Sequence, residues 1–218
     1  MIWSLDEKHL HSYVVRLLHS YLPDGGSATS VEVPWVRVAM ERLEYCFSHI
    51  HRKYYIVEGR PRFDHLNADH MASFLWFLGN SAWRDGGEDI AVRLSYLNKT
   101  MHGLDLFHSV AMPDIFVLAH PLGSVIGRGT FGNFLVVYQQ VTIGAAESGS
   151  AFPTLGEGVA MYAGSAVIGD CLVGDNVVFA AHSMLVDTHV PSGSMVVGRY
   201  PEHRLLKSDK SVRSRCFD

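Results

Sequence analysis

The stretch from Val125 to Val197 decides the fold, and its central part reads TLGEGVAMYAGSAVIGDCLVGDNVVFAAHSMLV over residues 154–186. Every sixth residue through it is bulky and apolar, except Gly149 and Pro191. The positions are Val125, Phe131, Val137, Ile143, Gly149, Leu155, Met161, Val167, Val173, Phe179, Leu185, Pro191 and Val197. A period of six fits neither a helix of 3.6 residues per turn nor one long strand. It predicts a hexapeptide β-helix of about four turns, in which short strands alternate with tight corners and three sides make a turn of about 18 residues.

A second inward position lies four residues after the first. It is occupied mostly by small or β-branched residues, which suit a narrow corner: Gly129, Leu135, Val141, Val159, Ser165, Cys171, Val177 and Ser183. Ile-Gly pairs and Asp or Asn residues nearby suit corners with unusual backbone angles. The pattern is lost over residues 145–153 (AAESGSAFP) and then resumes in phase, which predicts a loop projecting outward from the coil.

The residues before the coil show helical spacing of apolar side chains. Helices are expected over residues 5–21, 35–52, 66–83 and 88–100, with a connector over residues 54–62. The chain is therefore predicted to be α+β. Residues 1–104 would form an α-helical N-terminal domain, residues 105–200 the β-helix domain with its loop at 145–153, and residues 201–218 a C-terminal tail.

Composition excludes several classes of protein. A net charge of −4, with no block of like charges, gives no reason to expect a nucleic-acid partner. No stretch is apolar enough for a signal peptide or a membrane span, and three widely spaced cysteines suggest reduced thiols, so the cytoplasm is expected. The 13 histidines lack the paired spacing of metal ligands, and no metal is expected.

From Asp105 onward the chain reads DLFHSVAMPDIFVLAHPLGSVIGRG, then QQVTIGA, then the stretch quoted above, and finally VPSGSMVVGRYP. These motifs, over roughly residues 100–205, resemble the serine acetyltransferase family of hexapeptide-repeat acyltransferases. The resemblance implies an N-terminal helical domain, a left-handed parallel β-helix and acetyl-CoA as co-substrate.

The resemblance also implies two catalytic residues, His120 and Asp105, which have the family's spacing of fifteen positions. His120 would be the general base that takes the proton of the acceptor hydroxyl, and Asp105 would hold its imidazole in the working tautomer. Histidine suits this role because its pKa lies near neutrality. From the residues alone, His120 could equally cap the coil, and Asp105 could be a turn residue.

Two departures from the family pattern concern the acceptor. Phe152 stands where the family has a second histidine that contacts the substrate, so the acceptor pocket should be more apolar on that side, which argues against serine as the acceptor. The C-terminus (residues 213–218) lacks the terminal isoleucine with which serine acetyltransferases engage their sulfhydrylase partner. Neither departure affects acyl transfer itself.

Five residues are expected to bind acetyl-CoA by this resemblance. Ala163 and Ala181 match small corner residues that contact the pantetheine arm, while Arg199, Arg204 and Lys207 lie where they could meet the nucleotide phosphates. Coil packing alone also requires small corner residues, and the three cations could be a solvated basic tail.

Coils of this kind usually form homotrimers, or dimers of trimers, with active sites between neighbouring coils. We therefore expect His120 and Asp105 to face a neighbouring subunit. Three functions remain open: an acetyl-CoA-dependent O-acetyltransferase acting on serine or a sugar, a sugar N-acetyltransferase, and a non-catalytic trimeric scaffold.

Overall fold

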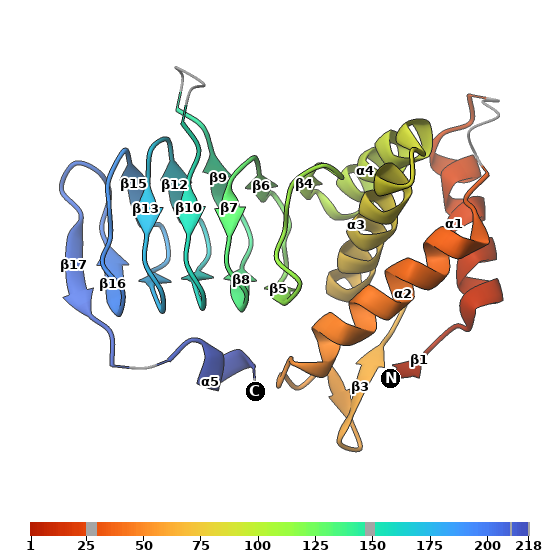
Figure 1. Cartoon of the computed structure of the whole chain (residues 1–218), viewed down its shortest axis with the longest axis horizontal. Helices are drawn as coiled ribbons and strands as arrows, with labels where there is room; N and C mark the ends of the chain where they lie inside the picture. Colours follow the sequence, from red (N-terminus) through yellow and green to blue (C-terminus); the bar gives the residue numbers. More distant parts are fainter. Residues whose placement is uncertain (25–29, 147–150, 210, 218) are drawn as a thin grey trace.

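The structure is a computed structural model that describes residues 1–24, 30–146, 151–209 and 211–217. Figure 1 shows helices at one end of the molecule and a coil of short strands at the other, with the C-terminal segment running beneath the coil toward the helices. The proposed domain boundary after residue 104 falls between helix α4 (Glu88–His102) and strand β4 (Asp105–Leu106).

The four predicted helical stretches each form a helix: α1 (Glu7–Tyr21), α2 (Val33–Ser48), α3 (Ala68–Arg84) and α4 (Glu88–His102). Asp6 caps α1 by accepting a hydrogen bond from the His9 backbone N–H, and Gly103 ends α4 in the left-handed conformation. Helix α3 is buried continuously from His70 to Ala82, because it packs against both α2 and α4. It is therefore the core of the helical domain.

The predicted connector over residues 54–62 is instead a hairpin of β2 (Ile56–Val57) and β3 (Arg60–Phe63). Its turn residues Glu58 and Gly59 both have positive φ, at 51° and 71°, as a tight two-residue hairpin turn requires. Strand β1 (Ile2–Trp3) pairs with β3 in parallel. Strands this short give no periodic signal, and half of the sheet's pairing depends on the N-terminal segment, which is distant in the sequence.

The coil consists of parallel strands of two to four residues arranged as three sheets. The sheets are β13-β10-β7, β16-β14-β11-β8-β5 with β17 at its edge, and β15-β12-β9-β6-β4. The strands are β4 (Asp105–Leu106), β5 (Phe116–Leu118), β6 (Val125–Ile126), β7 (Thr130–Phe131), β8 (Leu135–Val137), β9 (Thr142–Gly144), β10 (Thr154–Leu155), β11 (Ala160–Met161), β12 (Ala166–Ile168), β13 (Leu172–Val173), β14 (Val178–Phe179), β15 (Met184–Val186) and β16 (Ser194–Val197).

The pairing register explains why the six-residue phase survives the predicted loop. Thr154 pairs with Leu172 on the turn that follows it, and with Thr130 on the turn that precedes it. The step from Thr130 to Thr154 contains the loop and is longer than the next step by one hexapeptide. The described parts of the loop, residues 145–146 and 151–153, contain no strand. Residues 147–150, including Gly149 of the predicted stack, lie outside the described part of the chain.

The described positions of the predicted axial stack are buried from Phe131 to Ile143 and from Leu155 to Leu185, but the stack shifts by one residue at both ends. Ile126, Val190 and Val196 are buried at 3% exposure or less, rather than Val125, Pro191 and Val197. At each end, one side of the coil spans five residues instead of six. These sides run from Ile126 to Phe131 and from Leu185 to Val190. The second inward position is also buried, with the exception of Gly129.

Residues 201–209 and 211–217 fold back onto the molecule. Strand β17 (Arg204–Lys207) pairs antiparallel with β16, and the short helix α5 (Arg213–Cys216) follows. Val212 and Phe217 are buried, and Phe217 forms an antiparallel bridge with Ile50 at the end of α2. The C-terminal segment therefore connects the far end of the coil to the helical domain.

Candidate functional site

His120 lies at the corner that follows β5, on the side of the coil that adjoins helix α3. Its side chain is 73% exposed and its φ is +51°. Its backbone N–H donates to Asp69 Oδ1 at 3.0 Å, and its Nδ1 lies 3.7 Å from Asp69 Oδ2. The second distance fits an ion pair but is too long for a hydrogen bond. An accessible imidazole beside a fixed carboxylate is the arrangement required of a general base.

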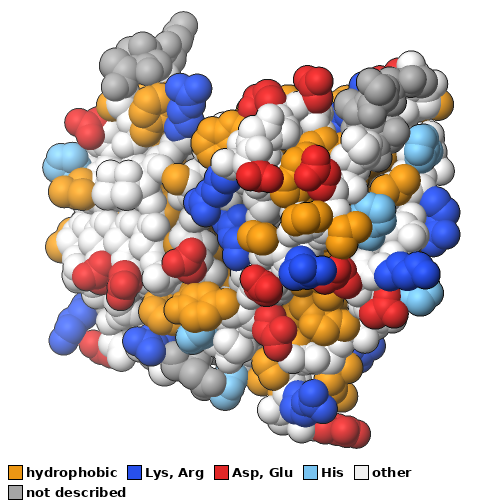
Figure 2. All heavy atoms as spheres, turned by 45° about the vertical axis from the view of Figure 1, so that its right-hand side comes forward, with side chains coloured by type: hydrophobic (Ala, Val, Ile, Leu, Met, Phe, Trp, Pro, Cys, Tyr) orange, Lys and Arg blue, Asp and Glu red, His pale blue; other side chains and the backbone are white. Residues whose placement is uncertain are grey.

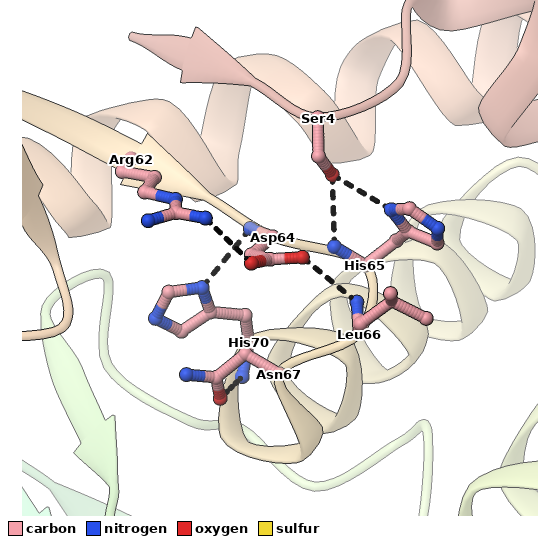
Figure 3. A network of polar contacts seen from close by, with 7 residues as sticks. All are labelled: Ser4, Arg62, Asp64, His65, Leu66, Asn67 and His70. Atoms are coloured by element: carbon pink, nitrogen blue, oxygen red, sulfur yellow. Dashed lines mark hydrogen bonds and ion pairs between the residues drawn. The ribbon is translucent and has the colours of Figure 1, made fainter.

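A polar network fixes the start of α3, which supplies Asp69 (Figure 3). The side chain of Asn67 accepts from the backbone N–H groups of Asp69 and His70, which caps the helix. Asp64 pairs with Arg62 at 2.7 Å and accepts from the backbone of Leu66. The network defines where α3 begins, so Asp69 occupies its first turn, where the helix dipole favours a negative charge.

His70, the neighbour of Asp69, belongs to the same network but faces the core. Its Nδ1 accepts the backbone N–H of Asp64 at 3.1 Å, and its ring packs among Phe47, Tyr55 and Phe63. Burial lowers the pKa of His70 to about 4. His70 is therefore a neutral structural residue at pH 7, and it orients the turn from which Asp69 projects.

The environment of Asp69 is mixed. Burial raises the pKa of its carboxyl above the usual value, while the His120 backbone N–H and the charges of His120 and Arg52 act in the opposite direction. Arg52 reaches across to the coil, where its Nη2 donates to the Tyr138 hydroxyl at 3.1 Å, and the Tyr55 hydroxyl donates to the Leu118 carbonyl at 3.3 Å. These contacts join the helical domain to the coil beside His120.

Asp105 lies on β4, and its carboxylate accepts from Lys99 Nζ at 2.6 Å. It lines a pocket of 220 Å³ together with Ser95, Tyr96 and Phe107. Both Asp105 and His120 are described residues, and within one chain no hydrogen bond or ion pair of 4 Å or less joins them. The predicted orientation of the His120 imidazole by Asp105 therefore stays a prediction, and the carboxylate beside His120 in this chain is that of Asp69.

Ala163 and Ala181 lie one turn apart on the same corner of the coil. The backbone N–H of His182 donates to the Ala163 carbonyl at 2.8 Å, which stacks the two corners directly. Arg199 follows on the next turn, where it bridges Met184. Arg204 and Lys207 are exposed on β17, and Lys207 lies 3.5 Å from Asp209. The five residues predicted to bind CoA thus include two on stacked corners, Ala163 and Ala181, then Arg199 opposite Met184 on the next turn, and two cations on the adjoining strand.

Phe152 is 39% exposed, next to Pro153, whose carbonyl accepts from the backbone N–H of Thr130 at 3.0 Å.

Within the described ranges, no group of three or more His, Cys, Asp or Glu side chains converges as metal ligands would. Over those same residues, no helix combines the length and apolar character needed to cross a bilayer. On the face shown in Figure 2, acidic and basic side chains are interspersed over the helical domain.

Comparison with known proteins gave the same family name repeatedly. Serine acetyltransferase of Synechococcus elongatus is 33% identical over 108 residues, which is 48% of this chain and 44% of that enzyme. Serine acetyltransferase of Staphylococcus aureus is 31% identical over 128 residues, 57% of this chain and 59% of that enzyme. The chain thus spans about half the length of these curated relatives. No family model matches it.

Solved structures agree on the fold. The structure of Neisseria gonorrhoeae serine acetyltransferase aligns over 93% of this chain and 81% of its own, with a TM-score of 0.67 and 21% identity. A second Neisseria structure contains serine (TM-score 0.64, 21% identity, 89% and 83% covered). A further serine acetyltransferase structure contains CoA (TM-score 0.60, 16% identity, 89% and 74% covered). The chain is therefore similar to serine acetyltransferases in sequence and in fold, and the predicted fold, a helical domain followed by a left-handed parallel β-helix, is confirmed.

Asp69 was not predicted from the sequence. It lies 51 residues before His120 and on a different element, so no local motif connects the two. The only available signal was the Asn-Ala-Asp run of residues 67–69, which indicates a helix start and nothing about catalysis.

Proposed function

We propose that the protein is an acetyl-CoA-dependent O-acetyltransferase that acts on a small hydroxyl-bearing acceptor. The observation that supports it most directly is the exposed imidazole of His120 beside a carboxylate, at a corner of a hexapeptide coil. The similarity to serine acetyltransferases supports the same reaction class, since solved members have serine or CoA bound.

In the proposed reaction His120 acts as general base. It removes the proton from the acceptor hydroxyl while that oxygen attacks the thioester carbonyl carbon. The tetrahedral intermediate then collapses, the C–S bond breaks, and the imidazolium returns the proton to the leaving sulfur, which gives an O-acetyl ester and CoA. Proton transfer by a positioned histidine contributes roughly 10²–10⁴ in rate. No covalent enzyme intermediate is required.

The stacked corners of Ala163 and Ala181, together with Arg199, are proposed to bind acetyl-CoA. Small side chains on one ridge allow an extended pantetheine arm to approach the backbone, and Arg199 lies on the next turn. Arg204 and Lys207 on β17 add positive charge at the same end of the coil, where the nucleotide phosphates would bind.

The acceptor is proposed to be serine or a sugar. Phe152 favours an acceptor with an apolar part, because its ring offers no conventional hydrogen bond where the family has a histidine. A sugar N-acetyltransferase would use the same base with an amine as nucleophile, so it remains the second candidate.

We also propose that the active form is a homotrimer, or a dimer of trimers, in which Asp105 and His120 face a neighbouring coil. Two of the three coil sheets have exposed outward residues, such as Val125 and Leu172. On the third sheet the outward Val136, Ala160 and Val178 are already buried within one chain. A neighbouring coil would therefore contact the first two sheets.

The three cysteines are free thiols, which agrees with the predicted reducing compartment, the cytoplasm.

Thiol release from acetyl-CoA tests this proposal, with serine, other amino acids and sugars as acceptors. We expect release with at least one acceptor, and a loss of about 10² or more in kcat for His120→Ala. His19→Ala, which changes an exposed histidine on α1, is the matched control and should keep full activity. Release that His120→Ala leaves unchanged would rule out this base, and no release with any acceptor would favour the scaffold.

A further inference from the structure

We propose that Asp69 is the positioning residue of His120, holding both its backbone and its imidazole from helix α3. This inference rests on the proposed function, and it assigns a role to a residue outside the coil. Each carboxylate oxygen makes a different contact: Oδ1 accepts the His120 backbone N–H at 3.0 Å, and Oδ2 lies 3.7 Å from Nδ1 of the imidazole.

The backbone contact fixes the corner on which the base is mounted. His120 has a positive φ of 51°, a conformation that is strained for a residue with a side chain. A hydrogen bond to a charged acceptor is stronger than one to a neutral acceptor, so the Asp69 contact stabilises the corner against that strain. The Asp69 side chain is only 17% exposed, which limits competition from water.

The second oxygen determines which ring nitrogen does the chemistry. With Oδ2 facing Nδ1, the proton of the neutral imidazole is favoured on Nδ1, and Nε2 is left with the lone pair that accepts the hydroxyl proton. The imidazolium formed at that step then has a carboxylate beside it, which stabilises its charge. The separation of Oδ2 and Nδ1 in the free protein is compatible with closer contact once an acceptor is bound.

Asp69 can act in this way because other contacts fix it in turn. The Asn67 cap and the network in Figure 3 define the first turn of α3. The charged and titratable groups around the carboxylate are His120, Arg52 and Tyr55, and Arg52 is itself bonded to Tyr138 on the coil. The helical domain is thus part of the catalytic apparatus, because it supplies the carboxylate that orients the base.

Three variants separate positioning from simple structural support. Asp69→Asn keeps an oxygen that can accept the His120 N–H but loses the charge that faces Nδ1, whereas Asp69→Ala loses both. Asp89→Asn is the matched control, since Asp89 is an acidic residue in the first turn of α4. The measurements are kcat and KM for thiol release, the pH profile of kcat/KM, and hydrogen exchange of the His120 amide.

We expect Asp69→Asn to lower kcat by up to about 10²-fold, as loss of orientation does, with KM for acetyl-CoA and the melting temperature near those of Asp89→Asn. The pH profile of its kcat/KM should differ from that of Asp89→Asn, because Asp69→Asn has no carboxylate facing Nδ1 of His120. Amide exchange at His120 should accelerate in Asp69→Ala and change little in Asp69→Asn.

Activity and pH profile equal to those of Asp89→Asn would overturn the inference and leave the proposed function standing. If the wild type releases no thiol with any acceptor, the proposed function fails and so does the catalytic role of Asp69. In that case His120 amide exchange still tests the contact: acceleration in Asp69→Ala supports it, and unchanged exchange refutes it.

Discussion

His70 and His120 show how the environment decides what one residue type does. The His70 ring is fully buried among aromatic rings and accepts a backbone hydrogen bond, so burial lowers its pKa to about 4. The His120 side chain, by contrast, is 73% exposed, and its ring does not pack in the core. His70 belongs to the first turn of α3 and faces the core, whereas His120 contacts that turn from the coil. Only the exposed ring can exchange a proton with a ligand.

The buried histidine makes stability depend on pH. Protonation is favoured in the unfolded chain below its ordinary pKa of 6.5 and in the folded chain only below about 4. The folded state should therefore lose stability as pH falls from about 6.5 to about 4, with no effect from this group above that window. The loss should approach about 3 kcal/mol for His70, since one unit of pKa corresponds to about 1.4 kcal/mol.

Urea unfolding of wild type and His70→Leu at pH 7, 5.5 and 4.5 measures this effect. The variant lacks the acceptor for the Asp64 backbone N–H, so it should be less stable at pH 7. Its stability should fall less steeply with acidity than that of wild type, so that the difference narrows. Parallel stability curves for the two proteins would contradict the prediction.

At the scale of the element, the coil depends on close approach of its turns at a stacked set of glycines. Gly132, Gly156 and Gly174 follow one another on successive turns of the coil. A Cβ on Gly132 would lie 2.6 Å from the Gly156 carbonyl carbon, and one on Gly156 would lie 2.8 Å from that of Gly174. A Cβ on Gly156 would also meet the Asp175 side chain, but because backbone atoms obstruct both positions, the turns would have to separate.

Gly156→Ala should therefore destabilise the protein, by roughly 1–3 kcal/mol, as overpacking does in rigid surroundings. Gly144→Ala is the matched control, because a Cβ there meets nothing within 4 Å. Its effect should stay within about 0.5 kcal/mol, the range of ordinary surface substitutions. Melting temperatures of the two variants, compared with wild type, decide the question, and equal effects would argue against close stacking at this corner.

At the scale of the whole molecule, the C-terminal segment joins the two domains. The Phe217 ring lies 5.3 Å from the Phe134 ring on the coil, while its backbone bridges Ile50 at the end of α2. The His51 backbone N–H donates to the Cys216 carbonyl at 2.9 Å, which adds a second contact with the helical domain. The segment predicted as a tail thus strengthens the same domain junction that places Asp69 beside His120.

Phe217→Ala should lower the free energy of unfolding by roughly 3 kcal/mol, the scale of a buried Phe-to-Ala change. The residue is only 3% exposed. Phe152→Ala, the same change at a residue 39% exposed, should have a much smaller effect on unfolding. Denaturant unfolding compares the two, and a Phe217 variant as stable as the Phe152 variant would show that the segment adds nothing to the junction.

Much of the fold was predictable because its signals are local and repeated. The four helices follow from the spacing of apolar residues, and the coil follows from the six-residue period. The turn that contains the loop is longer by one hexapeptide, so the period stays in phase after it. The hairpin of β2 and β3 was missed because its strands are too short to show a period. The one-residue shift at each end of the axial stack was missed because a single shortened side leaves the rest of the pattern intact.

By itself, then, the sequence determined the two-part architecture and placed His120 at the entrance to the coil, because side-chain periodicity dictates which residues must avoid water. Only the tertiary structure decided which carboxylate meets that histidine within one chain. Nothing in the sequence distinguishes Asp69 from Asp105 as the partner of His120. In the structure the Asp105 carboxylate is bonded to Lys99, whereas the capped start of α3 directs Asp69 toward the corner at His120. The reason is that contacts between residues 51 apart depend on how whole elements pack, and no local pattern encodes that.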